Sequence, residues 1–169
     1  MSTSPSVFGE GATLDQIGVV VEDIDAFASS MRRLFGIEPR IRSRNTYEGS
    51  LYRGEVVTAE VDTLFYDFFG IELEVHCPRN ATNVWHEHLQ RSGPGLHHIR
   101  VNLASNEQAV MHFTELSIDP AAQGDSMLGN GIKYTYWDTV PELGFFVETF
   151  NNLIRRPADS LRTETAERE

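Results

Sequence analysis

Four polar side chains occur in apolar, strand-like segments of this 169-residue chain, where an isolated polar group is costly to bury. Glu74 and Glu148 interrupt apolar runs, and Gln16 and His98 lie in β-rich runs. A carboxylate that faces a protein interior has to be paired or bind a metal. Two carboxylates, one amide and one imidazole therefore predict a site for one divalent metal ion, such as Mn, Co, Fe, Ni, Zn or Mg, rather than Cu.

An internal repeat would bring these residues together. Residues 14–21 and 96–103 are both β-rich, and each run leads through acidic and capping residues into a helical pattern that a proline closes. Strands are then predicted at residues 55–61, 63–69, 71–77, 132–137 and 145–150. In this alignment Gln16 corresponds to His98, and Glu74 corresponds to Glu148. A chance likeness between two strand–helix segments is the alternative.

The repeat predicts an α+β fold built from two βαβββ modules. The first module is expected at residues 13–77 and the second at residues 96–151. The linker, residues 78–95, contains a segment at 82–89 that is expected to be a short helix, which Trp85, His86 and His88 would only cap. Residues 1–12 and 155–169 are predicted to be flexible tails, because they lack large apolar residues at regular spacing.

Composition narrows the classes of partner. The formal net charge is −11, from 25 acidic and 14 basic residues, which disfavours nucleic acid and membrane surfaces. Cys77 is the sole cysteine, which excludes an internal disulfide and a Cys-rich metal site. The N-terminal segment lacks a basic leader and an apolar run, and no stretch approaches the roughly 20 apolar residues of a membrane span. A cytoplasmic location is therefore expected, whereas the acidity says little about a small-molecule substrate.

Several phrases of the sequence resemble one family. Asp15–Val21, Trp85–Leu89, Gly95–Ile99 and Pro141–Glu148 look like the vicinal oxygen chelate superfamily, which contains glyoxalases, bleomycin resistance proteins and extradiol dioxygenases. The resemblance is closest to the methylmalonyl-CoA epimerase and glyoxalase-like branch. It implies that two βαβββ modules form a cupped, incompletely closed mixed β-barrel around one metal, with the helices outside. Relatives with this layout often form homodimers, although the sequence does not decide between monomer and dimer.

The resemblance also implies a set of metal ligands, which by position are Gln16, Glu74, His98 and Glu148. Glu74 is preferred to Glu72 because the family's proline follows the ligand at the spacing of Glu74 to Pro78. Both glutamates lie on the same strand face, so Glu72 stays the alternative. The metal-dependent epimerases usually carry histidine at the position of Gln16. The amide oxygen is a weaker ligand, so a metal-free binding protein of the same fold stays open.

Residues that share strand faces with these ligands are candidates for substrate binding, namely His76, Arg100, Tyr134 and Tyr136. His76 is alternatively a ligand or a hydrogen-bond donor to one. Arg100 needs an anionic partner, which is either a structural carboxylate such as Glu72 or a substrate carboxylate. The two tyrosines line the cavity or pack in the core. His97 alternates to the opposite face and is expected to pack or lie at the surface.

The function that the resemblance implies is a metal-dependent isomerase, epimerase or lyase. Its substrate would be a small carbonyl compound, such as an acyl thioester, keto acid or hemithioacetal, that reacts through a metal-stabilised enolate. Glu148 and Glu74 are the candidate catalytic bases. One alternative is a metal-free small-molecule binding or resistance protein. A weaker alternative is an extradiol-type dioxygenase, because that chemistry uses two histidines and one carboxylate on Fe(II) and would require His76 as a ligand.

Overall fold

The computed structural model describes residues 8, 12–103, 106–129 and 131–151. In chain order, the elements are β1 (Thr13–Val20), α1 (Ile24–Phe35), β2 (Ile41–Tyr52), β3 (Glu55–Phe68), β4 (Ile71–Pro78), α2 (Val84–Ser92), β5 (Gly95–Asn102), α3 (Asn106–Glu115), β6 (Pro120–Asp125), β7 (Lys133–Trp137), α4 (Val140–Leu143) and β8 (Phe146–Asn151). The order β-α-β-β-β thus occurs twice. Helix α2 lies between the two halves, and the short α4 precedes the last strand.

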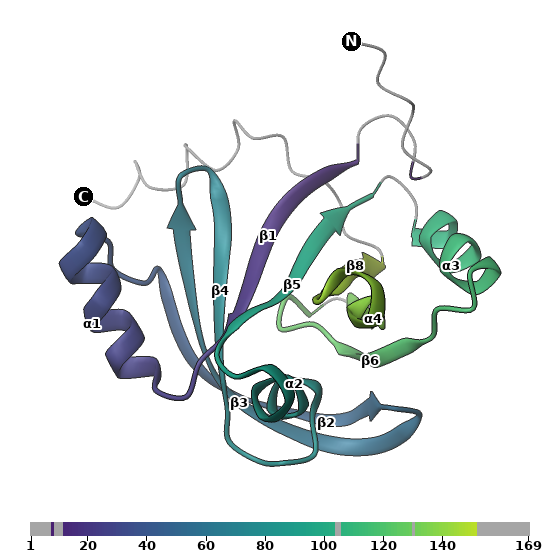
Figure 1. Ribbon diagram of the computed structural model, residues 1–169, viewed down its shortest axis with the longest axis horizontal. Coiled ribbons are helices and arrows are strands. Elements are labelled where there is room, and N and C mark those ends of the chain that lie inside the picture. The colour runs from purple at the N-terminus through teal and green to yellow at the C-terminus, as the bar shows by residue number, and fades with distance from the viewer. Residues whose placement is uncertain (1–7, 9–11, 104–105, 130, 152–169) are drawn as a thin grey trace, which may run out of the picture.

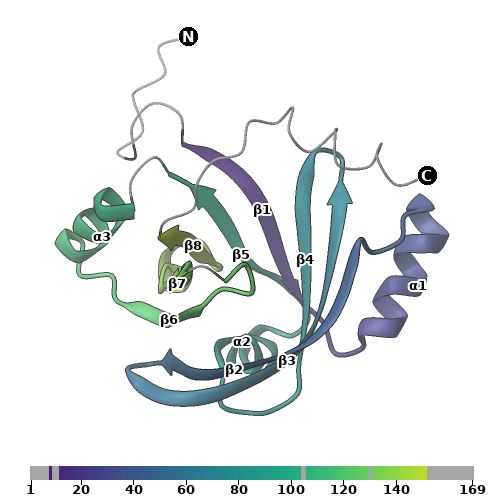
Figure 2. The ribbon, with the colours of Figure 1, turned by 180° about the vertical axis from the view of Figure 1, so that it is seen from behind.

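The strands form one mixed β-barrel in the order β1-β4-β3-β2-β6-β7-β8-β5 (Figure 1). Strand β1 pairs in parallel with β4 and antiparallel with β5, so it joins the first half of the chain to the second. Strand β5 in turn pairs in parallel with β8. Helices α1 and α3 lie on opposite sides of the molecule, and α2 contacts β1, β4 and β5 (Figure 2).

The barrel is closed, which corrects the expected incompletely closed cup. Closure depends on a short antiparallel pairing of β2 with β6, in which Leu51 lies opposite Gln123 and Tyr52 lies opposite Ala122. Strand β2 has 12 residues, so its end extends far enough to reach a strand of the other half. The two halves therefore share a single barrel interior.

The strand predictions fail for the strands that close this barrel. Predicted strands at 55–61 and 63–69 are one continuous strand, β3, and β2 and β6 were not predicted. Most residues of β2 are exposed or only partly buried, and many are polar, so it lacks a strong apolar period. Strand β6 contains proline, glycine and alanine instead of the β-branched residues that favour strands. Apolar runs therefore located the ligand-bearing strands but missed these two.

Helix α1 begins and ends at the residues that the sequence indicates. Asp23 is the N-cap, and its side chain accepts hydrogen bonds from the backbone N–H groups of Asp25 and Ala26, both at 2.9 Å. Gly36 ends the helix with a φ of 68°, a left-handed conformation that glycine adopts without strain. The buried face of α1 packs against the outer side of β3 and β4.

The linker contains the expected short helix, α2, which Asn83 caps by accepting a hydrogen bond from the backbone N–H of His86 at 2.7 Å. Most of the predicted tails, 1–12 and 155–169, lies outside the described residues. Phe8 is described, and its ring packs against that of Phe113 with the centroids 5.8 Å apart. Within the described ranges no helix is long and apolar enough to cross a bilayer.

The cap of α1 gives a direct test of the helix start. Replacing Asp23 with Ala removes the acceptor of two backbone hydrogen bonds. We expect the free energy of unfolding, measured by urea denaturation, to fall by about 1 kcal/mol. The control is Ser29→Ala in the exposed middle of the same helix, which should change it by less than about 0.5 kcal/mol. Equal effects of the two substitutions would contradict the capping role.

Candidate metal centre

Four neighbouring strands, β4, β1, β5 and β8, place the predicted ligands in two rows. The first row, from β4 to β8, is Glu72, Gln16, Arg100 and Glu148. The second row is Glu74, Gly18, His98 and Phe146. Side chains two residues apart on a strand share a face, so both rows face the barrel interior.

The four predicted ligands meet around the imidazole of His98. Its Nε2 lies 3.1 Å from Oε1 of Gln16, 3.3 Å from Oε2 of Glu148 and 3.4 Å from Oε2 of Glu74. The exposed fraction is 0% for His98, 1% for Gln16, 2% for Glu148 and 7% for Glu74. The residues whose ligand roles were predicted from sequence are therefore side by side and shielded from water.

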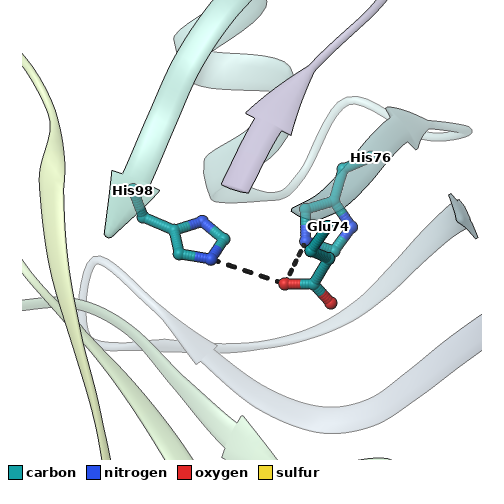
Figure 3. Close-up of side chains that lie close together, drawn as sticks. All are labelled: Glu74, His76 and His98. Carbon is teal, nitrogen blue, oxygen red and sulfur yellow. Dashed lines mark ion pairs between the residues drawn. The ribbon is translucent and has the colours of Figure 1, made fainter. Parts of the chain in front are cut away.

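His76 belongs to the same cluster. The ligand atoms of Glu74, His76 and His98 all lie within 4.8 Å of one another, and in the described part of the chain these three residues form a group that could hold a metal ion (Figure 3). His76 and Glu74 are two residues apart on β4 and so share its inner face. This position of His76 supports the first of its two predicted roles, that of a candidate ligand.

Two atoms of the cluster have unused bonding capacity. Nε2 of His76 and Oε2 of Glu148 are buried, and neither has a hydrogen-bond partner among the described residues. Nε2 of His76 lies 3.2 Å from Oε2 of Glu74, but the pair lacks hydrogen-bond geometry. Leaving such a polar atom unsatisfied costs about 1–3 kcal/mol. A cation bound between these atoms would remove that cost, so the donor set fits a divalent metal ion.

The pKa shifts within the cluster also favour a site for a divalent cation. Burial lowers the pKa of His98, but the carboxylates of Glu148 and Glu74 outweigh burial and raise it to about 9. Burial likewise raises the pKa of Glu74, yet the imidazoles of His76 and His98 bring it well below its usual range. Two buried carboxylates thus interact with the imidazole of His98. A divalent ion in place of the His98 proton would have both carboxylates as ligands of opposite charge.

Gly18 leaves the space that the His98 ring occupies. It lies on β1 directly opposite His98, between the strands of Glu74 and His98. A Cβ added at Gly18 would lie 1.9 Å from Cε1 of His98, far inside van der Waals contact. Only glycine therefore allows the imidazole to lie across β1 and approach the carboxylate on β4.

His97 packs in the interior, which is one of its two expected positions, although a β-bulge breaks the alternation of β5. The pairing register of β5 with β1 shifts between Gly18 and Val19, which leaves His97 as an extra residue. His97 is fully buried, and its Nδ1 lies 2.9 Å from Nδ1 of His98. Burial holds the pKa of His97 well below its usual value, so the Nδ1 of its neutral ring can accept a hydrogen bond from His98 Nδ1–H. This bond leaves His98 Nε2 facing the carboxylates.

Of the other predicted substrate-binding residues, Arg100 is occupied by structural carboxylates. Its Nε donates to Oδ1 of Asp15 at 2.9 Å, and its Nη2 lies 3.6 Å from Oε1 of Glu72. Its guanidinium carbon also lies 4.7 Å from the ring centroid of Phe150. Of the two partners considered from sequence, a structural carboxylate is therefore the one observed.

The two tyrosines lie on the inner face of β7 and are buried. The ring of Tyr136 lies 4.9 Å from that of His98, and the Tyr134 hydroxyl lies 3.4 Å from Oγ of Ser50. Burial, followed by the charge of Glu148, holds the pKa of Tyr136 well above its usual value. Tyr136 is thus adjacent to the cluster, and Tyr134 packs beside it with ring centroids 5.2 Å apart.

Trp85 does more than cap the linker helix, which corrects the sequence-based expectation. It is 2% exposed, and its ring lies 4.8 Å from His76 and 5.8 Å from Tyr47. The buried residues of α2 are Val84, Trp85 and His88, spaced as one helix face. That spacing was the signal in the sequence, but nine residues are too few to show a convincing apolar period.

Comparison with known families decides which one this chain belongs to. A model of the glyoxalase/bleomycin resistance protein/dioxygenase superfamily matches residues 15–136. The chain belongs to this superfamily. The family that the sequence motifs indicate is thus confirmed, although no curated protein is significantly similar to the chain.

Solved structures with this superfamily fold are similar over most of their length. A hypothetical protein from Bacillus halodurans is 15% identical with a TM-score of 0.63, over 88% of this chain and 99% of that one. A variant of the Streptomyces coelicolor methylmalonyl-CoA epimerase, in complex with 2-nitronate-propionyl-CoA, is 18% identical with a TM-score of 0.59, over 83% and 97%. The Mycobacterium tuberculosis methylmalonyl-CoA epimerase is 13% identical with a TM-score of 0.56, over 88% and 91%. At these identities, the similarity establishes the fold.

A double-mutant cycle can test whether Gly18 is needed to leave room for the His98 ring. We expect Gly18→Ala to lower the free energy of unfolding by about 1–3 kcal/mol, because its methyl group overlaps the His98 ring. In a His98→Ala background the ring is absent, so the same methyl group should cost almost nothing. Urea denaturation of the four proteins measures both effects. If Gly18→Ala still lowers the free energy of unfolding without the His98 ring, glycine is required there by the backbone and not by the ring.

The raised pKa of His98 predicts how stability depends on pH in chelator-treated protein. The folded-state pKa of about 9 exceeds the unfolded value of about 6.5. The proton on His98 therefore contributes full stability below about pH 6.5, and this contribution is lost as the pH rises through about 9. The loss should be of the order of 3 kcal/mol. It is measured by urea denaturation between pH 6 and pH 10, with His98→Gln as the control that should lack this component.

Proposed function

We propose that the protein is a metal-dependent isomerase, epimerase or lyase that acts on a small carbonyl compound with an acidic α-proton. The observation that carries the proposal is the pair of buried carboxylates beside His98, together with buried ligand atoms of His76 and Glu148 that have no hydrogen-bond partner among the described residues. Glu74, His76 and His98 would hold the metal, and Gln16 and Glu148 would complete the set. A bound divalent ion would supply Lewis-acid polarisation of a carbonyl oxygen.

The residues of this chain would then move a proton. Glu148 and Glu74 are the two carboxylates that can accept it from the α-carbon, and both are shielded from water. Glu148 is the better candidate, because its Oε2 has no hydrogen-bond partner among the described residues and faces one imidazole, whereas Glu74 faces two. The rings of Tyr136 and Trp85 pack against His98 and His76 and help to exclude water from the same space.

The choice of substrate class is supported by chemistry and by fold. Abstraction of an α-proton needs a carbonyl oxygen that can be polarised, which acyl thioesters, keto acids and hemithioacetals all offer. Among similar solved structures, methylmalonyl-CoA epimerases share the fold of this chain. An acyl thioester is therefore the first class of substrate to examine.

Two measurements on one set of proteins test the proposal. Elemental analysis of the purified, untagged protein should find about one divalent transition metal or magnesium ion per chain, and His98→Ala should lose it. The metal-loaded protein should exchange the α-proton of an acyl-CoA or a keto acid with deuterated solvent. Glu148→Gln should reduce that exchange by at least 100-fold, because it removes the base.

The matched control is Glu142→Gln, which removes one negative charge from an exposed position on α4 outside the cluster. It should keep both the metal and the exchange. Absence of metal from the wild-type protein, even after incubation with excess Mn²⁺, Co²⁺, Zn²⁺ and Fe²⁺, would overturn the proposal in favour of a metal-free binding protein.

The position of His76 favours a second candidate, an extradiol-type dioxygenase. Glu74, His76 and His98 provide two imidazoles and one carboxylate, which is the donor set of non-haem Fe(II) oxygenases. The metal identity separates the two functions. Iron found by elemental analysis, with oxygen consumption in the presence of a catechol and no α-proton exchange, would favour the dioxygenase.

A further inference from the structure

We propose that Glu72 is a positioning residue that makes Gln16 an oxygen ligand. The inference deepens the proposed function and rests on the metal site, but it concerns a residue that does not itself reach the centre. In most metal-dependent epimerases the position of Gln16 is a histidine, so this chain needs another way to present a ligand atom there. The geometry around the Gln16 amide provides it.

The Gln16 amide is held at both ends. Its Nε2 donates to Oε1 of Glu72 at 2.7 Å, and its Oε1 lies 3.1 Å from Nε2 of His98. A side-chain amide has one donor end and one acceptor end, whereas an ionised carboxylate only accepts. Glu72 therefore takes the donor end, and the oxygen has to face His98. Because Gln16 is 1% exposed, water cannot compete for either end.

Glu72 is itself held in place by two arginines. Its Oε2 accepts a hydrogen bond from Arg40, and its Oε1 lies 3.6 Å from Nη2 of Arg100. Arg100 is in turn paired with Asp15 at 2.9 Å. Two arginines and two carboxylates thus fix the orientation of Glu72. The group lies beside the cluster and interacts with it, because burial lowers the pKa of Arg100 while the charges of Glu148, Asp15 and Glu72 raise it.

The orientation of the Gln16 amide matters because its two ends have opposite effects on a nearby cation. The oxygen can bind a cation, whereas the NH₂ group would point two partly positive hydrogens at it. A hydrogen bond from Nε2 to a carboxylate also polarises the amide and makes its oxygen a better donor. The same geometry separates the two glutamates of β4: Glu74 lies beside His98, and Glu72 acts through Gln16.

The alternative is that Glu72 only neutralises Arg40 and Arg100. The two roles differ in one respect: a positioning role requires Gln16, and a neutralising role does not. A double-mutant cycle on metal affinity therefore separates them. The cycle uses Glu72→Gln, which removes the obligate acceptor at almost constant size, and Gln16→Met, which removes both ends of the amide.

The experiment measures the dissociation constant of Co²⁺ by competition with a chelator, in the full-length chain. We expect Glu72→Gln to weaken binding by about 10- to 100-fold, as is typical when the partner of a metal ligand is lost. In the Gln16→Met background, Glu72→Gln should change the constant by less than about threefold. The matched control is Asp67→Asn on β3, which removes a carboxylate that lies opposite Glu72 in the strand pairing but is exposed.

A loss of affinity with Glu72→Gln that persists without Gln16, or that Asp67→Asn reproduces, would overturn the positioning role.

A second readout does not depend on metal. In chelator-treated protein, the Gln16 side-chain amide signal, identified by its loss in Gln16→Met, should show slowed hydrogen exchange that Glu72→Gln accelerates. Unchanged exchange would also overturn the inference. Absence of Co²⁺ binding by the wild-type protein would overturn the proposed function, and the amide signal would still decide the orientation.

Discussion

The burial of two carboxylates beside one imidazole is the constraint on which the rest of this structure depends. Glu74 and Glu148 lie inside a closed barrel, and both interact with the imidazole of His98, whose pKa they raise. A buried, uncompensated charge is too costly to keep without a counter-ion. The carboxylates, together with Gln16, His76 and the buried atoms that lack a hydrogen-bond partner among the described residues, are consistent with a site for a divalent cation.

Strand β1 is the part of the fold that makes this arrangement possible. It pairs with β4 from its own half and with β5 from the other half, so every candidate ligand lies on β1, on a neighbour of β1 or one strand further. Gly18 opens space over β1 for the His98 ring, and Gln16 reaches the same ring from the row beside it. A tandem repeat becomes a single site because β1 and β5 are adjacent.

The limits of sequence reasoning are visible in particular residues. Gln16, Glu74, His98 and Glu148 could be found because each interrupts an apolar, strand-like run at a repeated position. His97 packs, as one of its two expectations had it, but its contact with His98 could not be predicted, since a one-residue bulge breaks the alternation of β5. Trp85 lies in a helix too short to show its buried face, and β2 and β6 lack the composition that marks strands. The barrel therefore closes through segments that carry almost no local signal.

The sequence by itself determined the two-fold repeat, the family and the four polar residues that meet in the interior. These features depend on local periodicity and on the cost of burying a polar group, both of which can be read along the chain. Only the tertiary structure decided that the barrel closes, that His76 joins the cluster, and that Arg100 is held by Asp15 and Glu72. Those outcomes depend on strand register and on distances between residues far apart in the chain, which no local pattern encodes.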